Sequence, residues 1–331
     1  MLEKSFDEKI ELFNKEDIEN YPRFYPEGED KKLFDAIRND NLIIFYGAGV
    51  SKLAGCAGWI ELAEKIVYKF PKEIYSEQDK IILKEMANTD PKKVISVCYH
   101  RVKNDKKLLE NVYFKAIKDS VTPSKVKEFI EIHNKIFNLN AVSYVTTNID
   151  KGIESIENID LGKKKTFELT DSDNESNLLN EIKNGNIFYL HGTVDNIEGT
   201  IFTVDNYFEF YTKENNNRFL REIFSGKFSV LFIGYRLNEY EILQNIFLAV
   251  SNQNTEIALY KHFLLAPIYS KDIAKFNIEK EYFKIFSIKA IPYFIDYDGY
   301  GRLNYVLDLL IKTFREHKQD IISVFNEIDQ V

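Results

Sequence analysis

The stretch 41-NLIIFYGAGVSKLAGCAGW-59 decides how this chain folds. Residues 41–46 have the length and the β-branched and aromatic content of a buried strand. Gly47 begins a turn of small residues, and the apolar spacing from Trp59 to Phe70 predicts an amphipathic helix that packs on the sheet. A strand, a glycine turn and a helix in this order predict the beginning of an α/β fold.

Two interpretations of the glycine turn are open. Gly47, Ala48 and Gly49 remove side-chain bulk where backbone N–H groups could approach a ligand, and Ser51 adds a hydroxyl beside them. This is how proteins hold a pyrophosphate. The third glycine of the common dinucleotide fingerprint would fall at position 52, which is Lys52. The turn taken alone therefore fits a tight turn without a ligand equally well.

Composition bounds the class of protein. The chain has 331 residues, 44% hydrophobic and 29% charged, which is typical of a soluble globular protein with one large domain or two smaller ones. Its net charge of −8 argues against a surface that coats nucleic acid, although a local basic patch stays open. Two cysteines, Cys56 and Cys98, cannot form a disulfide framework or a four-cysteine zinc site, and we expect no metal. The charged N-terminal segment and the lack of a long apolar run predict a cytoplasmic protein with no membrane contact.

Strand-like and helix-like segments alternate along the chain. The expected strands are 41–46, 141–147, 166–169, 186–190, 200–203, 228–233, 262–266 and the two runs 282–287 and 290–297. The expected helices are 59–70, two or three within 77–137, 205–212, 216–225, one reaching about 250, and 302–317. This order predicts an α/β fold, a Rossmann-like and mainly parallel sheet with helices on both faces and a helical insertion after the first helix.

Four of these strands are followed within two residues by Gly47, Asn148, His191 and Gly234. Ligands bind at the carboxyl ends of strands in parallel sheets, so this placement predicts a shared site. Each residue also has a structural interpretation, because Asn148 and Asp150 could cap a helix, His191 could be a hydrogen-bonded strand-end histidine and Gly234 could form a turn. The remaining histidines, His100, His133, His262 and His317, show no metal-site spacing, and we expect them at the surface or at strand ends.

The order of the motifs adds specificity. Residues 47–51 (GAGVS), 146–150 (TTNID), 191–192 (HG) and 232–239 (FIGYRLNE) resemble, in sequence order, the motifs of the sirtuin family. The resemblance covers roughly residues 40–315 and is closest in form to the sirtuin-like domains of bacterial anti-phage defence proteins. It implies a Rossmann-like sheet, NAD as the substrate and cleavage of the bond between nicotinamide and ribose.

The resemblance also implies roles for particular residues. The diphosphate would be held by the backbone of Gly47, Ala48 and Gly49 with the Ser51 hydroxyl. The adenosine half of NAD would contact Gly234, Tyr235 and Asn238. Asn148 would bind the nicotinamide ribose and orient the attacking water, and Asp150 would contact the nicotinamide carboxamide. His191 would bind the ribose hydroxyls and act as the general base.

The chain departs from the deacetylases of the family. They carry a four-cysteine zinc module after the HG motif, whereas the segment between Gly192 and Phe228 contains no cysteine. We therefore expect NAD hydrolysis to ADP-ribose and nicotinamide, and deacetylation is the less favoured activity. A non-catalytic module that binds NAD or ADP-ribose is the alternative class, although such a module would not need Asn148 and His191.

The resemblance suggests a division of the chain and a class of partners. Residues 1–40 would form an N-terminal arm with a surface or a partner-binding role, 41–317 the NAD-binding catalytic domain with a helical insertion at 71–138, and 318–331 a C-terminal helix or tail. An NAD-depleting effector would harm its own cell if it were always active. We therefore expect a homo-oligomer or a separate sensor, an ATPase or an Argonaute-like protein, to activate it, and we expect no direct contact with nucleic acid.

Overall fold

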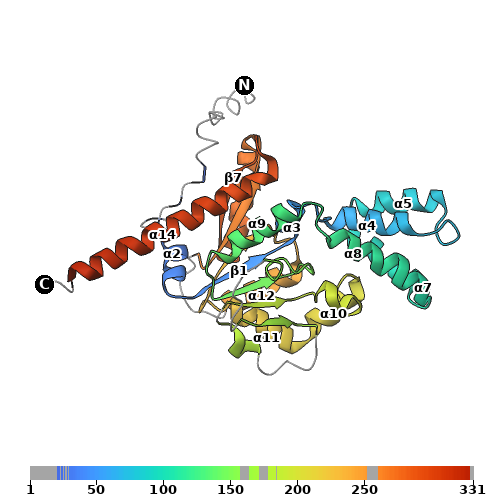
Figure 1. The fold of residues 1–331 in the computed structure, drawn as a ribbon, viewed down its shortest axis with the longest axis horizontal. Helices are drawn as coiled ribbons and strands as arrows, with labels where there is room; N and C mark the ends of the chain where they lie inside the picture. The colour runs from blue at the N-terminus through green and yellow to red at the C-terminus, as the bar shows by residue number, and fades with distance from the viewer. Residues whose placement is uncertain are drawn as a thin grey trace.

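A seven-stranded, fully parallel β-sheet forms the centre of the chain in the computed structural model (Figure 1). The structure describes residues 21, 22, 24, 26, 28, 30–156, 164–170, 178–183, 185–251 and 260–328, with side chains to 316. The strands are β1 Leu42–Tyr46, β2 Ser143–Thr146, β3 Thr166–Glu168, β4 Asn186–Tyr189, β5 Ser229–Ile233, β6 His262–Ile268 and β7 Ile288–Phe294. Their order across the sheet is β3-β4-β2-β1-β5-β6-β7, so the Rossmann-like α/β prediction is confirmed and the opening stretch supplies the central strand.

Alternate side chains of the strands pack on opposite layers of helices. Ile43 and Phe45 of β1 face a layer formed by α10 (Val204–Thr212), α11 (Glu214–Ile223), α12 (Tyr240–Ser251) and α13 (Ile273–Lys284). Leu42, Ile44 and Tyr46 face α2 (Lys31–Arg38), α9 (Val126–Phe137) and α14 (Arg302–Ile328). Burial of both faces explains why β1, LIIFY, is apolar along its length, while β2, SYVT, carries a buried serine and a buried threonine at its two ends.

A separate helical lobe projects from one end of the sheet (Figure 1). It contains α4 (Trp59–Lys69), α5 (Glu77–Ala87), α6 (Pro91–Val102), α7 (Lys106–Leu108), a π-helical segment Leu109–Phe114 and α8 (Lys115–Val121). The apolar side of α4 packs against α5, α6 and α8 in a core of its own. The expectation that this side packs on the sheet is wrong, because the neighbouring helices supply enough apolar surface to bury it.

Three further expectations differ from the structure. Residues 200–203 form no strand, because Ile201 and Phe202 are buried as an irregular segment whose Ile201 N–H donates to the carbonyl of His191. Residues 282–287 complete α13 and its turn, since Phe283 and Phe286 follow a helical spacing from the buried Phe276. Helix α14 continues to Ile328 without a break at 317.

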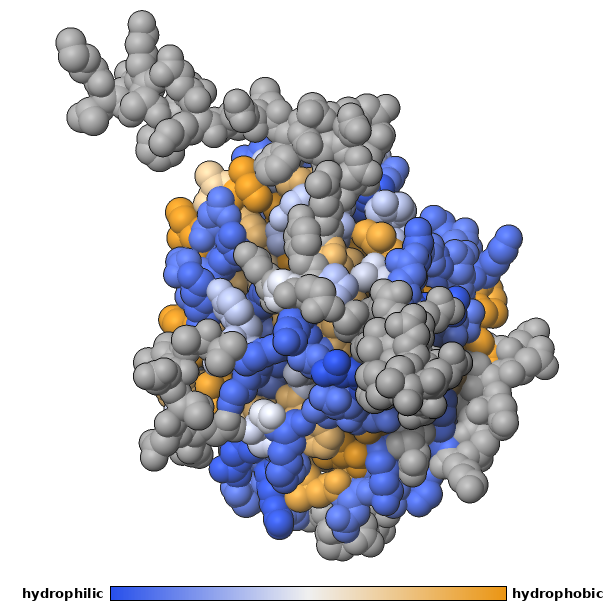
Figure 2. Space-filling model, turned by 90° about the vertical axis from the view of Figure 1, so that its left-hand side faces the viewer, coloured by the Kyte–Doolittle hydropathy of each residue, from blue (hydrophilic) through white to orange (hydrophobic). Residues whose placement is uncertain are grey.

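Residues 1–20 of the predicted arm and 329–331 of the predicted tail lie outside the described residues. Residues 31–38 of the arm form α2, which packs on the sheet, and residues 318–328 of the tail continue α14. The end of the molecule seen in Figure 2 is mainly hydrophilic, with hydrophobic residues in scattered groups. Among the described helices, none combines the length and the apolar character needed to cross a bilayer.

Candidate active site

The glycine turn packs directly against the turn that follows β5. Gly49 N–H donates to the Gly234 carbonyl at 2.9 Å, and Gly47 N–H donates to the Ile233 carbonyl at 3.0 Å. A Cβ on Gly49 would lie 2.7 Å from the Gly234 oxygen, and a Cβ on Gly234, at φ +61°, would lie 2.7 Å from the nitrogen of Val50. Both residues must therefore be glycine for the two turns to meet, whatever ligand they hold.

Tyr235 and Asn238 continue the turn after β5. The ring of Tyr235 packs on Phe45 with a centroid distance of 4.9 Å, and a Cβ on Gly47 would lie 2.6 Å from it. Asn238 is exposed. Ala48 begins the five-residue helix α3 (Ala48–Lys52), so the predicted phosphate turn is itself the first turn of a short helix.

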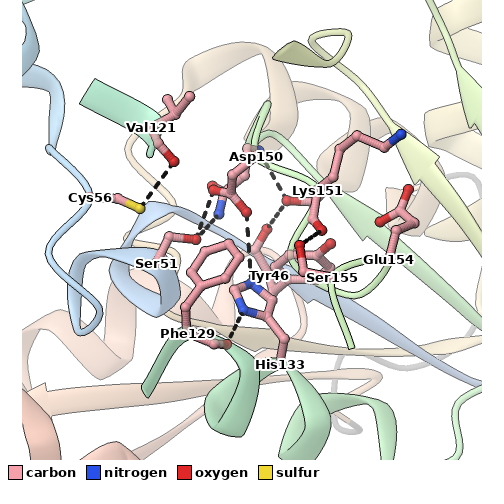
Figure 3. Close-up of polar contacts among 12 residues, drawn as sticks. Tyr46, Ser51, Cys56, Val121, Phe129, His133, Asp150, Lys151, Glu154 and Ser155 are labelled. Atoms are coloured by element: carbon pink, nitrogen blue, oxygen red, sulfur yellow. Dashed lines mark hydrogen bonds and ion pairs between the residues drawn. The ribbon is translucent and has the colours of Figure 1, made fainter. Parts of the chain in front are cut away.

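A hydrogen-bonded chain joins the first turn to the TTNID motif. The Ser51 hydroxyl donates to Asp150 Oδ2 at 2.8 Å, and Asn148 Nδ2 donates to Ser51 Oγ at 3.0 Å. Thr146 fixes the TTNID segment to β1, because its Oγ1 accepts from Asn148 N–H at 3.0 Å and donates to the Tyr46 carbonyl at 2.9 Å. Ser51, Asn148 and Asp150 are all buried. The structure thus brings Ser51 next to Asn148 and Asp150, which lie 97 and 99 positions later in the chain. Figure 3 shows Ser51 beside Asp150.

Burial affects the charge of this cluster. It raises the pKa of the Asp150 carboxyl, against the opposing effects of His133 and of the Ser51 hydrogen bond. Burial also raises the pKa of the neighbouring Cys56 thiol to about 12, and its Sγ donates to the Val121 carbonyl at 3.3 Å. Cys56 is therefore an unreactive, packed thiol near neutral pH.

His191 lies at the end of β4, next to the TTNID segment. Hydrogen bonds from Leu190 N–H to the Thr146 carbonyl (2.9 Å) and from Val194 N–H to the Ile149 carbonyl (2.9 Å) tie its flanks to both sides of Asn148. Its side chain is 1% exposed. Burial lowers the pKa of His191 to about 4, so the imidazole is neutral near pH 7 and can accept a proton.

Two tyrosines of α10 contact the imidazole. Tyr211 Oη lies 3.1 Å from His191 Nε2, and Tyr207 Oη lies 3.4 Å from His191 Nδ1. Both hydroxyls also reach the carboxylate of Glu239 at 3.5 Å. In this conformation both ring nitrogens of His191 contact protein groups and neither faces open solvent.

The helical lobe also contacts the residues that cover His191, namely Tyr207 and Glu239. Lys92 of α6 lies 3.7 Å from Glu239 Oε1 and 3.8 Å from the centre of the Tyr207 ring. Trp59 at the beginning of α4 packs on the same ring. A movement of the lobe would therefore change the contacts of the residues that cover His191.

Several residues of this site escape the sequence analysis. Tyr207 and Tyr211 occupy an expected helix at a spacing of four, which could have placed them on one face, but nothing in the sequence aims that face at His191. Glu239 belongs to the quoted FIGYRLNE motif without a predicted role. His133 is wrongly assigned to the surface or a strand end, because it lies in α9 with 0% exposure. His100 is exposed, and His262 begins β6, as predicted.

Comparisons with known proteins agree with this arrangement. Residues 142–291, which contain the strands that carry Asn148, His191 and Gly234, match the SIR2-like domain. Over these residues the chain is similar to SIR2-like proteins. It is 26% identical over 216 residues to the NAD(+) hydrolase ThsA of Cytobacillus dafuensis, covering 64% of this chain and 38% of that protein. It is 23% identical over 290 residues to defense-associated sirtuin 2 of Bacillus subtilis, covering 86% of this chain and 26% of that protein.

The matched part is only a fraction of each relative. The chain spans 38% of the length of ThsA and 26% of the length of the Bacillus sirtuin. Within the part of the chain that the structure describes, no three His, Cys, Asp or Glu side chains gather as a metal site. The sirtuin resemblance predicted from the four motifs is confirmed, while the roles of the individual residues remain predictions.

Proposed function

We propose that this SIR2-like domain hydrolyses NAD to ADP-ribose and nicotinamide in the cytoplasm, as the NAD-depleting effector of an anti-phage defence system. The observation that carries the proposal is the hydrogen-bonded chain from Asn148 through Ser51 to Asp150, beside a buried neutral His191. Relatives named as an NAD(+) hydrolase and a defence-associated sirtuin support the same reaction.

The chemistry requires positioning more than a strong acid. Nicotinamide leaves as a neutral molecule from a cationic ring, so the ribose develops oxocarbenium character and needs a well-placed water. Asn148 Nδ2 donates a hydrogen bond to Ser51 Oγ, which leaves the amide oxygen of Asn148 as an acceptor for that water or a ribose hydroxyl. The diphosphate would lie beside the turn of Gly47, Ala48 and Gly49, but not on the Gly47 and Gly49 N–H groups, because these donate to protein carbonyls. Gly234, Tyr235 and Asn238 would lie at the adenosine half. The predicted contact of Asp150 with the nicotinamide carboxamide would be indirect, through Ser51 and Asn148, because Asp150 Oδ2 accepts from Ser51 and Oδ1 faces His133.

Activity would be controlled by assembly or by a partner. The supporting observation is that Tyr207 and Tyr211 contact both ring nitrogens of His191. For His191 to act on a ribose hydroxyl or on water, α10 has to shift. An oligomer or a separate sensor protein would supply the free energy for that shift by binding the open arrangement more tightly.

The test is NAD cleavage by the pure protein, alone and in every assembly state obtained, followed by nicotinamide release. We expect His191→Asn and Asn148→Ala to lose cleavage. His262→Asn and Asn186→Ala change the same residue types in buried places at the amino ends of β6 and β4, and they should retain it. Tight NAD binding without turnover in any assembly state would contradict the hydrolase proposal and favour a non-catalytic NAD-binding module. Release of acetyl from an acetylated peptide would instead support the deacetylase activity.

A further inference from the structure

A buried histidine of α9, His133, lies next to Asp150 of the proposed active site. His133 Nδ1 lies 2.8 Å from the carbonyl oxygen of Phe129, one helical turn earlier. A carbonyl only accepts, so Nδ1 carries a hydrogen, and Nε2 of the neutral ring is a lone pair. That nitrogen points at Asp150 (Figure 3).

Nε2 of His133 lies 3.8 Å from Asp150 Oδ1. Neither atom has a hydrogen-bond partner within the described parts of the chain. Two lone pairs that face each other in a buried space repel, and a proton on one of them would relieve the repulsion; at 3.8 Å the contact is electrostatic and longer than a hydrogen bond. Burial raises the pKa of Asp150 and lowers the pKa of His133, and both effects favour a protonated Oδ1 beside a neutral imidazole.

The other carboxylate oxygen fixes the orientation of Asn148. Asp150 Oδ2 accepts the only hydrogen of the Ser51 hydroxyl, so Ser51 presents a lone pair to Asn148 and binds its amide nitrogen. A proton on Oδ2 would reverse the chain, because Ser51 would then accept from Asp150 and donate to the Asn148 oxygen. The amide would turn its NH₂ group toward the ligand, and an NH₂ group cannot accept a hydrogen from water.

We propose that His133 is a positioning residue that keeps the Asp150 proton on the oxygen facing α9 and so holds the amide oxygen of Asn148 toward the ligand. This inference rests on the proposed function, because NAD hydrolysis requires the amide oxygen of Asn148 to face the water or the ribose. His133 acts only through Asp150 and Ser51. None of the three sequence motifs around the cluster includes it.

The surrounding packing is built to admit the imidazole. A Cβ on Gly152 would lie 2.0 Å from His133 Nε2, so only glycine fits two residues after Asp150. The ring of Phe129 lies 4.4 Å from the imidazole and that of Tyr46 lies 5.9 Å away, measured between centroids. This apolar enclosure excludes bulk water, which would otherwise satisfy both polar atoms.

The other ionisable groups near this pair are Tyr46, Cys56, Tyr189 and Glu154. Burial raises the pKa of the first three far above neutrality, so they stay uncharged as the pH falls. Glu154 accepts from Tyr189 Oη at 2.5 Å and is the remaining acid beside the pair. A Glu154→Gln variant removes this acid and leaves Asp150 as the carboxyl whose protonation is followed.

The first experiment measures NAD hydrolysis against pH for His133→Leu and His133→Gln in the active assembly. Leucine removes the partner that lowers the pKa of Asp150, so that pKa rises. We expect kcat at pH 7 to fall about tenfold with KM changed less than about twofold, and the acid limb of kcat to move up by about one pH unit. Glutamine can accept the Oδ1 proton through its amide oxygen Oε1, as His133 Nε2 does, and should restore most of both. A His133→Leu variant that is less stable but keeps the wild-type kcat and acid limb would overturn the proposal.

The second experiment does not depend on activity. NMR titration of the full chain with ¹⁵N-labelled histidine follows His133, assigned by its loss in His133→Gln. We expect an Nδ1–H tautomer, and a lower pKa of His133 in Asp150→Asn, because the carboxylate raises it. An unchanged titration in Asp150→Asn would refute the shared proton even if NAD is cleaved. Wild-type protein that cleaves no NAD in any assembly state, but shows this coupling, would remove the proposed reaction and leave the proton where we place it.

Discussion

The Ser51 hydroxyl lies 2.8 Å from Asp150 Oδ2, although the two residues are 99 positions apart in the chain. Ser51 also accepts from Asn148 at 3.0 Å, so a single hydroxyl joins the glycine turn to the TTNID motif. The hydrogen bonds of Ser51 orient both neighbours, which makes it the residue through which the two motifs act together.

Ser51→Ala should lower kcat for NAD hydrolysis about 100-fold, because Asn148 loses the acceptor that fixes its amide. Stability should fall by only about 1 kcal/mol. The matched control is Ser143→Ala, which removes an equally buried hydroxyl at the amino end of β2. Equal losses of kcat in the two variants would show that Ser51 has only a structural role.

The double variant Tyr207→Phe/Tyr211→Phe should increase NAD hydrolysis by the unassembled chain about tenfold. It removes both hydroxyl contacts to His191, each worth about 1 kcal/mol, and so weakens the covered state. Tyr144→Phe, a buried tyrosine whose hydroxyl donates to the Phe137 carbonyl, is the control. A fall in the activity of the fully assembled enzyme would instead assign the hydroxyls to proton transfer from His191.

Gly234→Ala should destabilise the fold by more than about 2 kcal/mol, since a side chain there suffers both a positive φ and contact with Val50. Two other glycines separate these causes. Gly299 has a φ of +55° in open space, and its change to alanine should cost about 1 kcal/mol. Gly301→Ala meets nothing within 4 Å and should cost less than about 0.5 kcal/mol. Chemical denaturation of the three variants gives the ranking, and equal values for Gly234 and Gly299 would exclude the close approach of the turns.

The free energy of unfolding should fall as the pH drops from about 6.5 toward 4. Burial lowers the pKa of His191 to about 4 and that of His262 to about 3, so the unfolded chain binds protons in this range that the folded chain does not. Above the unfolded pKa, both states are neutral and no loss occurs. Each histidine contributes a slope of up to about 1.4 kcal/mol per pH unit.

His262→Asn tests this slope. The asparagine oxygen can accept from Val230 N–H, as His262 Nδ1 does at 3.2 Å, but it does not titrate. Denaturation at a series of pH values should show a slope smaller by about one histidine's share. A slope identical to that of the wild type would mean that His262 gains its proton without unfolding.

The sequence alone determined the class of fold and the identity of its motifs. The central strand 42–46, the parallel sheet and the positions of Asn148, His191 and Gly234 beyond strand ends follow from apolar runs and glycines, which are local signals. Local signals failed where the outcome depends on which distant segments pack together. Helix α4 packs within its own lobe, and the apolar residues 200–203 do not pair as a strand.

Only the tertiary structure decided what each polar side chain contacts. Gly49 is needed because Gly234 approaches it, Gly152 because His133 does, and His191 is covered because α10 returns over the sheet. His133 had no motif to reveal it, since its function depends on a distance to Asp150 and no spacing in the chain encodes that distance. The strands bring the motifs to one edge, and the packing of α9 and α10 behind and above that edge sets the charge and the access of the site.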